Sequence, residues 1–397
     1  MHLNFIKNTV LLFVLTLLSC RNQTNSQAQS PLRVGAQQTE TYLPILKNKT
    51  VGILANQTSV IFKEDGYTHL VDSLLSLNVA VKKVFAPEHG FRGIADAGEY
   101  VKDGVDSGSG VPIVSLYGAN KKPSAQALDG LELIIFDVQD VGARFYTFLS
   151  TLHYIIETCA ELGITVLVLD RPNPNGHYVD GPILDLNNSS FVGMHPVPIV
   201  HGMTVGEYAK MINGEGWLSE GVQCTLKVIP VENYTHQTVY NLPINPSPNL
   251  PNAAAINLYP SLCLFEGTNV SVGRGTELQF QVFGSPFLEG SDYNFEFIPT
   301  PNVGAKYPKH DAKICKGLNL KEHPNLSHLE LKWLLEAYQN TENKSEFFNP
   351  FFTKLSGVKL LQNQIEAGLS ADEIRESWKP DLERYKLLRT PYLLYPL

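Results

Sequence analysis

Apolar runs alternate with amphipathic stretches between about residues 48 and 170, and each apolar run ends in polar, turn-forming residues. Helical spacing of apolar positions predicts helices over 69–77 and 148–162. β-branched and aliphatic runs predict strands over 50–55, 79–84, 111–116, 133–136 and 164–169. Strands that alternate with helices are typical of a parallel sheet built from βαβ units, so we expect an α/β domain here.

The pattern changes after residue 180. Residues 203–213 predict a helix that begins with a capping box of Thr204 and Glu207, and residues 224–231 predict a strand. Residues 241–252 are dense in Pro and Asn, which places a domain junction near residue 240. A strand over 280–283 and helices near 327–340, 357–367 and 371–377 then predict a smaller α+β domain. We therefore expect one domain over 39–240 and a second over 241–397.

The amino terminus has the pattern of a secretory signal peptide. Lys7 precedes an apolar run over 10–18 that ends in Ser19 and Cys20, and this run is shorter than the roughly 20 apolar residues of a spanning helix. Leu17–Cys20 resembles the bacterial lipobox, so Cys20 is the expected lipidation site; the alternative is a plain secretory signal with an incidental Cys. Residues 1–20 are thus predicted to be a lipoprotein signal peptide. Residues 21–38, rich in Gln, Asn and Ser, predict a flexible tether.

These features predict a protein of the bacterial cell envelope that contacts a membrane only through its lipid anchor, as a periplasmic or outer-membrane lipoprotein. The net charge of −8 argues against nucleic acid as a partner. With 43% hydrophobic and 18% charged residues, the chain can bury a large core. The four cysteines after Cys20 are scattered without metal-ligand spacing, and dinucleotide, P-loop, GxSxG and HExxH motifs are absent. We expect neither a metal nor a cofactor.

The segment after the second predicted strand carries the strongest candidate chemistry. It reads Phe-Ala-Pro-Glu-His-Gly-Phe-Arg-Gly and brings Glu88, His89 and Arg92 into a turn. In open parallel sheets, ligands bind in the crevice beyond the carboxyl ends of the strands. Glu88 is therefore the first candidate for a catalytic acid. The alternative is that Glu88 caps the next helix.

The other strand ends are polar too, which predicts a shared rim. Tyr117 follows the third predicted strand, and Asp137 and Asp140 follow the fourth. Most glycoside hydrolysis needs two carboxylates that flank the scissile bond, so either aspartate is a candidate partner for Glu88. The alternative for Asp137 is that it caps the following turn or pairs with Arg144.

Further candidates for substrate binding come from the loops. Arg144 and Tyr146 predict an anion clamp and a sugar platform, unless Arg144 simply lies on the surface. His201 is either a structural histidine or a member of the site, and Asp170 either binds ligand or only orients its neighbour. The other residues predicted to bind substrate lie in loops rich in Pro, Gly and Asn: Arg171, Asn173, Asn249, Glu266, Asn269, Arg274 and Glu277.

Several blocks taken together resemble the exo-β-N-acetylmuramidase family, glycoside hydrolases long treated as a domain of unknown function. They are PEHGFRG, FDVQDVGARFYTF, DRPNP, HGMTVGE, SPNLP and LFEGTNVSVGRGT, and the match runs from about residue 50 to the carboxy terminus. The resemblance implies a Rossmann-like larger domain, a smaller carboxy-terminal domain and an active-site cleft at their junction. It also implies removal of N-acetylmuramic acid from the non-reducing end of peptidoglycan fragments.

The resemblance makes Glu88 the proposed catalytic residue and leaves its partner open among Asp137, Asp140, Glu266 and Glu277. Muramic acid carries a lactyl carboxylate, so we expect a cation near that group, with Arg144 or Arg274 as candidates. The alternative function is a non-catalytic envelope lipoprotein that binds peptidoglycan glycans. An esterase or amidase is disfavoured because no nucleophile motif is present.

Overall fold

The computed structural model describes residues 31–92, 99 and 103–397. The predicted signal peptide, Cys20 and residues 21–30 of the predicted tether lie outside these residues. The end of the predicted tether packs against the sheet domain. The backbone of Arg33 pairs with that of Glu232, and Gly35 N donates to Asp170 O at 2.8 Å. Residues 35–37 form a 3₁₀ turn, and helix α2 (Thr39–Leu46) follows directly.

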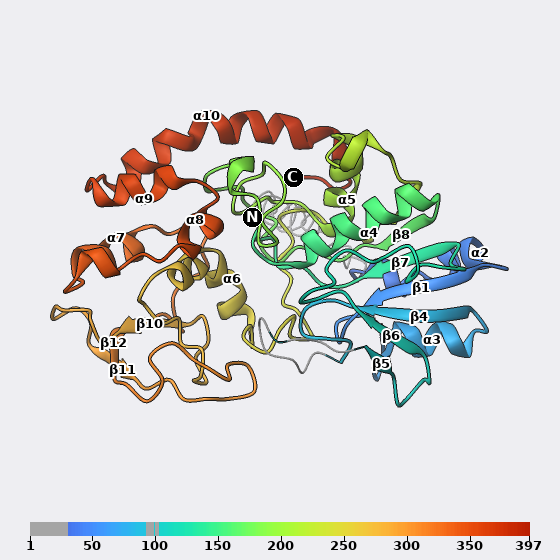
Figure 1. The fold of residues 1–397 in the computed structure, drawn as a ribbon, viewed down its shortest axis with the longest axis horizontal. Helices are drawn as coiled ribbons and strands as arrows, with labels where there is room; N and C mark the ends of the chain where they lie inside the picture. Colours follow the sequence, from blue (N-terminus) through green and yellow to red (C-terminus); the bar gives the residue numbers. More distant parts are fainter. Residues whose placement is uncertain (1–30, 93–98, 100–102) are drawn as a thin grey trace, which may run out of the picture. The chain divides into compact units, whose positions relative to one another are not determined.

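A seven-stranded sheet forms the first half of the fold (Figure 1). Its strand order is β5-β6-β4-β1-β7-β8-β9, and all pairs are parallel except β5 with β6. Counted along the chain without the short edge strand β5 (Gly104–Val105), this is the 3-2-1-4-5-6 order of a Rossmann-like fold. The parallel strands are β1 (Thr50–Ala55), β4 (Ala80–Ala86), β6 (Pro112–Ser115), β7 (Leu133–Asp137), β8 (Thr165–Leu169) and β9 (Leu226–Ile229). The predicted parallel α/β class is confirmed.

The strands are apolar along their length because both faces of the sheet are covered. Phe85, Ile134 and Phe136 belong to one core with the buried faces of α4 (Phe148–Leu162) and α5 (Val205–Gly214). Alternate strand residues such as Ile53 and Val84 point to the other face. Helix α3 (Leu70–Ser76) packs against β4. This two-sided burial explains the continuous apolar runs of the sequence.

Local sequence rules account for several boundaries. The capping box that predicts α5 is present, with Thr204 Oγ1 accepting from Glu207 N and Glu207 Oε2 accepting from Thr204 N. Helix α4 ends at Gly163, which adopts the left-handed conformation that favours glycine. The sequence pattern missed the hairpin of β2 (Val60–Lys63) and β3 (Gly66–His69), which is inserted between β1 and α3.

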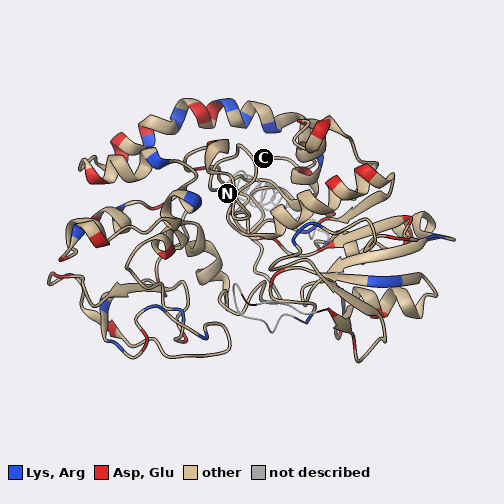
Figure 2. Ribbon diagram, viewed as in Figure 1, with Lys and Arg blue, Asp and Glu red and all other residues tan. Residues whose placement is uncertain are grey.

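The second half is the predicted smaller α+β region. A three-stranded antiparallel sheet pairs β10 (Val282–Ser285) and β11 (Phe295–Phe297) with the central β12 (Cys315–Asn319). Its helices are α6 (Ala253–Leu262), α7 (Lys332–Gln339), α8 (Phe351–Ser356), α9 (Lys359–Glu366) and α10 (Ala371–Arg389). Helix α10 continues through Pro380, well past the predicted end at residue 377. It carries charged residues of both signs along its length (Figure 2).

The carboxy-terminal segment returns to the large sheet. Figure 1 shows α10 running from beside α9 towards α5. Tyr385 on α10 donates to His201 O at 2.9 Å, and Tyr395 donates to Asp170 Oδ2 at 2.5 Å. One apolar core extends from Leu54 to Tyr385, so residues 33–397 pack as a single unit.

Within the described part of the chain, no helix combines the length and apolar character needed to cross a membrane. The cysteines at positions 159, 224, 263 and 315 are buried free thiols.

A buried histidine pair joins the helices that cover one face of the sheet. His153 on α4 and His195 share a hydrogen bond of 2.9 Å between Nδ1 and Nε2, and His195 Nδ1 lies 3.1 Å from the hydroxyl of Tyr208 on α5. The ring of Trp217 stacks on His195 with centroids 4.8 Å apart. Burial holds the pKa of His195 well below its usual value of 6.5 and also lowers the pKa of His153.

This pair predicts a loss of stability on acidification. Below pH 6.5 the unfolded chain takes up protons on these rings, whereas burial disfavours their protonation in the folded protein. The free energy of unfolding should therefore fall by up to about 1.4 kcal/mol per pH unit for each such proton. The free energy of unfolding, measured by urea unfolding at several pH values between 7.5 and 5, should fall less steeply with decreasing pH for His195→Gln than for the wild type. His328→Gln, at an exposed site, is the control. The same dependence of the free energy of unfolding on pH in all three proteins would contradict the prediction.

Candidate active site

A cavity of about 690 Å³ opens beyond the carboxyl ends of β4 and β6. The sheet side contributes Glu88, His89, Tyr117 and residues 145–147 to its lining. The carboxy-terminal region contributes Tyr259 of α6, the 3₁₀ segment Cys263–Gly267, and the loops that carry Arg274 and residues 304–309. The cavity therefore lies between the two halves of the fold, where the sequence resemblance implied a cleft.

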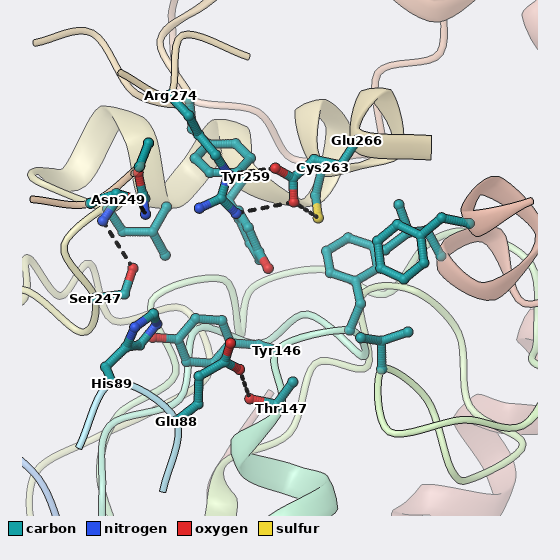
Figure 3. Close-up of a pocket in the computed structure, with 18 of the residues that line it drawn as sticks. Glu88, His89, Tyr146, Thr147, Ser247, Asn249, Tyr259, Cys263, Glu266 and Arg274 are labelled. Carbon is teal, nitrogen blue, oxygen red and sulfur yellow. Dashed lines mark hydrogen bonds and ion pairs between the residues drawn. The ribbon is translucent and has the colours of Figure 1, made fainter. Parts of the chain in front are cut away.

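Glu88 lies in this cavity two residues after the end of β4, and the residue is 9% exposed. Thr147 Oγ1 donates to Glu88 Oε2 at 2.5 Å (Figure 3). Thr147 is also the N-cap residue directly before α4. The carboxylate is thus held in place by a side chain from the adjoining helix end.

His89 follows Glu88 and lines the same wall. Its φ of 70° lies in the left-handed region, which costs a residue other than glycine conformational energy and is enriched at functional sites. Figure 3 shows His89, Tyr146 and the Glu88 carboxylate on the same side of the cavity. Burial holds the pKa of Tyr146 well above 10, and its hydroxyl donates to Pro246 O at 3.0 Å. Tyr146 is therefore a neutral phenol.

The opposite wall carries a carboxylate and a guanidinium bound to each other. Arg274 Nε and Nη2 donate to the two oxygens of Glu266 at 2.5 and 3.0 Å. Burial by itself would lower the pKa of Arg274, but the charge and hydrogen bonds of Glu266 outweigh it and raise that pKa. The guanidinium also lies 5.1 Å from the ring centroid of Phe280. Figure 3 shows this pair across the cavity from Glu88.

Two further polar groups reach the cavity between these walls. Tyr259 points its hydroxyl inward in Figure 3, and burial keeps its pKa well above 10. Asn249 donates to Gly304 O at 2.6 Å, and its buried Oδ1 accepts no hydrogen bond from the described residues. A buried acceptor without a protein donor is a natural contact for a sugar hydroxyl or amide.

Asp137 and Arg171 form a buried ion pair outside the lining of the cavity. Arg171 Nε and Nη2 donate to the carboxylate of Asp137 at 2.6 and 3.0 Å. Burial raises the pKa of Asp137, and the charge of Arg171 partly offsets this effect. Asp137 is fully buried and Arg171 is 2% exposed. The pair joins the ends of β7 and β8, so Asp137 pairs with Arg171 and not with Arg144.

Asp140 and His201 are also buried away from the cavity lining. Asp140 Oδ2 accepts from Gly142 N at 2.6 Å and lies 3.7 Å from His201 Nε2. His201 Nδ1 accepts from Met203 N, which fits the structural interpretation of this histidine. Asp170 accepts from Thr204, Gly206 and Tyr395, so it joins β8 to α5 and to the end of the chain.

Arg144 is buried behind the cavity wall. Its Nη1 donates to Pro182 O and Val197 O at 2.9 and 2.7 Å, and its Nη2 donates to Leu355 O and Ser356 O at 3.0 and 2.7 Å. The guanidinium is thus committed to backbone carbonyls, and burial lowers its pKa. Arg144 is 2% exposed, so it lies neither on the surface nor on the cavity lining.

Of the residues predicted to bind substrate, His89, Tyr117, Tyr146, Asn249, Glu266 and Arg274 line the cavity. Arg92 forms an ion pair with Asp106 at 2.8 Å, and Glu277 is exposed. Along with these two, the predicted residues outside the lining are Arg144, Asp170, Arg171, Asn173, His201 and Asn269.

Several residues that line the cavity were not predicted from the sequence. A sequence pattern could have indicated one of them, but not the others. Thr147 follows Tyr146 in the block FDVQDVGARFYTF, so its position just before a predicted helix was a usable signal. Lys121, Lys309 and Lys354 belong to loops or helices without a distinctive pattern. Lys309 donates to the carbonyls of Phe265, Thr268 and Val270, and burial lowers its pKa to about 8.

The chain matches known proteins over almost all of its described length. Models of exo-β-N-acetylmuramidase NamZ match residues 51–254 with the N-terminal part and residues 257–395 with the C-terminal part. The peptidoglycan β-N-acetylmuramidase NamZ of Bacillus subtilis (strain 168) is 34% identical over 374 residues, or 89% of each chain.

Two crystal structures of DUF1343 family proteins from Bacteroides fragilis NCTC 9343 are also similar. Their TM-scores are 0.85 and 0.77, and their sequence identities are 49% and 26%. Each match covers 92% of this chain and 99% of the other.

A Rossmann-like sheet, a carboxylate at a strand end within a cavity and these matches together define a glycoside hydrolase. The chain belongs to the exo-β-N-acetylmuramidase NamZ family, which confirms the resemblance found in the sequence. The two family models meet between residues 254 and 257, a little beyond the junction expected near residue 240.

The hydrogen bonds from Arg144 to four backbone carbonyls predict a structural role for this residue. Arg144→Met removes the donors and leaves the acceptors buried, so we expect a loss of about 3–5 kcal/mol in the free energy of unfolding. Urea unfolding measures this loss. Arg384→Met, at an exposed side chain, should change stability by less than about 0.5 kcal/mol. A stable Arg144→Met protein with weakened binding of muramic acid would instead place Arg144 in the substrate site.

Proposed function

We propose that this enzyme is an exo-acting β-N-acetylmuramidase. It hydrolyses the glycosidic bond of N-acetylmuramic acid at the non-reducing end of peptidoglycan fragments, with Glu88 as the principal catalytic carboxylate. Family membership supports the substrate class. The observation that carries the assignment of Glu88 is its position in the cavity at the end of β4, held by Thr147.

Glu88 is suited to act as the acid that protonates the leaving oxygen. Its carboxyl group lies on the cavity wall, and its Oε2 accepts from Thr147 Oγ1 at 2.5 Å. The neutral phenol of Tyr146 lines the same cavity and adds no competing charge. General acid catalysis requires a carboxyl group within hydrogen-bond reach of the leaving oxygen, and Glu88 lines the cavity in which we expect the sugar to bind.

Glu266 is our proposal for the second carboxylate. Of the four candidates for this role, it alone lines the cavity, whereas Asp137, Asp140 and Glu277 do not. Its two oxygens are fixed by Arg274, so its negative charge is held in one orientation. From the wall opposite Glu88, this charge would stabilise the positive charge that develops on the sugar ring in the transition state.

We further propose that the enzyme is exported to the bacterial envelope and anchored by a lipid on Cys20. The lipobox-like sequence Leu17–Cys20 supports this proposal. Expression of the full chain in a bacterium with a lipoprotein pathway should place the protein in the membrane fraction and label it with radioactive fatty acid. Cys20→Ala should abolish the label. Equal labelling of both proteins would contradict lipidation at this residue.

The catalytic assignment predicts a large loss of rate when the acid is removed. Glu88→Gln keeps the size of the side chain and its contact with Thr147, but it cannot donate an acidic proton. We expect kcat on a chromogenic β-N-acetylmuramide to fall by about 10²–10⁴-fold, with little change in stability. Wild-type turnover by Glu88→Gln would exclude Glu88 as the acid.

The second carboxylate is tested in the same assay. Glu266→Gln should lower kcat by a comparable factor, because the fixed charge opposite Glu88 is lost. Glu277→Gln is the matched control, since Glu277 belongs to the same loop region but is exposed and outside the lining. If Glu266→Gln resembles Glu277→Gln, Glu266 is not the second catalytic carboxylate.

A further inference from the structure

Two lysines on one wall of the cavity are held by very few contacts. Lys121 Nζ lies 4.5 Å from the ring centroid of Phe191, and this is its one assigned interaction in the described chain. Lys354 Nζ donates to Asn188 O at 3.3 Å. An ammonium group has three donors, so each lysine keeps at least two for a ligand.

The other cations of the cavity have no such capacity. Arg274 is bound to both oxygens of Glu266, and Lys309 donates to three backbone carbonyls. The lining contains four Lys and Arg side chains against two carboxylates, in a protein whose net charge is −8. The cavity is therefore locally positive, and its uncommitted positive charge belongs to Lys121 and Lys354.

Both lysines contact the same short segment of the wall, residues 188–191. Between their contact residues lies Ser190, which also lines the cavity. Its hydroxyl oxygen is buried and has no hydrogen-bond partner in the described part of the chain. A buried hydroxyl without a partner is uncommon in folded proteins, and it is a ready donor to an anion. Two ammonium groups and one hydroxyl thus meet at this segment.

Aromatic rings keep this wall in place. Phe191 packs on Tyr117 with ring centroids 6.0 Å apart, and it stacks on Tyr154 of α4 at 6.3 Å. Tyr117 follows β6, so the segment is fixed to the same edge of the sheet that delivers Glu88. The anion-binding donors therefore belong to the same cavity as the proposed catalytic acid.

We propose that Lys121, Lys354 and Ser190 form the subsite for the lactyl carboxylate of N-acetylmuramic acid. This inference rests on the proposed function, and it assigns the recognition of the acidic group to residues other than Arg144 and Arg274. The lactyl carboxylate is the feature that distinguishes muramic acid from N-acetylglucosamine. Ammonium groups next to an apolar ring suit a carboxylate on a short ether, because they bind the charge while Phe191 packs against the methyl group.

The experiment measures binding of the sugar product, which needs no turnover. Calorimetric titration of the full chain uses N-acetylmuramic acid, its lactyl methyl ester and N-acetylglucosamine. For Lys121→Met/Lys354→Met we expect the Kd for N-acetylmuramic acid to rise by about 10–100-fold. The Kd values for the two uncharged ligands should change by less than about twofold. Ser190→Ala should show a smaller rise with the same selectivity.

Lys344→Met is the matched control. Lys344 also places its ammonium over an aromatic ring, 5.9 Å from Tyr338, but it is exposed and outside the cavity. The Lys344→Met protein should bind all three sugars with the Kd values of the wild type. The proposal would be overturned if the double variant lost equal affinity for charged and uncharged sugars, or if its affinity for N-acetylmuramic acid did not change.

A peptide stem is a second source of carboxylates in peptidoglycan fragments, and one further ligand distinguishes it. In N-acetylmuramoyl-L-alanyl-D-glutamate the lactyl group is an amide, so all negative charge lies on the peptide. If the double lysine variant loses affinity for this ligand alone, the peptide stem is the bound group and the lactyl assignment is overturned. A wild type that binds N-acetylmuramic acid through these lysines but cleaves no muramide would contradict the proposed function and leave the subsite intact.

Discussion

The arrangement of the cavity depends on one buried cation, Arg144. Its guanidinium joins three segments that are far apart in the sequence: the loop before α4, residues 182–197 and the end of α8. Residues 145–147 and 354–355, which line the cavity from two sides, directly adjoin these contacts. Because a buried guanidinium without a carboxylate must satisfy its donors with carbonyls, the segments have little freedom to separate. A residue that does not line the cavity thus connects two parts of the chain that do.

The polar rim of the sheet has two functions in the folded protein. At the ends of β4 and β6, Glu88 and Tyr117 enter the cavity. At the ends of β7 and β8, Asp137 binds Arg171, and Asp170 binds Thr204 and Tyr395. The second group of contacts holds the β7–β8 edge, α5 and the chain end together. A strand-end carboxylate therefore marks the functional edge of the sheet, but its partners determine whether it reaches a ligand.

The sequence was sufficient for most of the sheet and for the position of Glu88, because both follow from local patterns. Apolar runs predicted the strands, and Pro87 with the polar residues after it predicted the turn that carries the acid. Roles that depend on distant partners could not be predicted in this way. The pairing of Asp137 with Arg171 and the burial of Arg144 involve residues 34 and 212 positions away. The sequence around Lys354 has no distinctive pattern, and its contact with Asn188 follows only from the fold.

The same reasoning explains which cations of the cavity are available to bind an anion. A cation that already has close partners gains little from an anionic ligand, since the ligand must replace bonds of similar strength. Arg274, Lys309 and Arg144 have such partners, although the sequence alone favoured two of these three as anion binders. The two lysines near residues 188–191 have fewer assigned contacts in the described protein, and they lie on the wall of the cavity that also holds Glu88. A sugar acid bound there would meet the proton donor and the lysines within one cavity, while the committed cations maintain its walls.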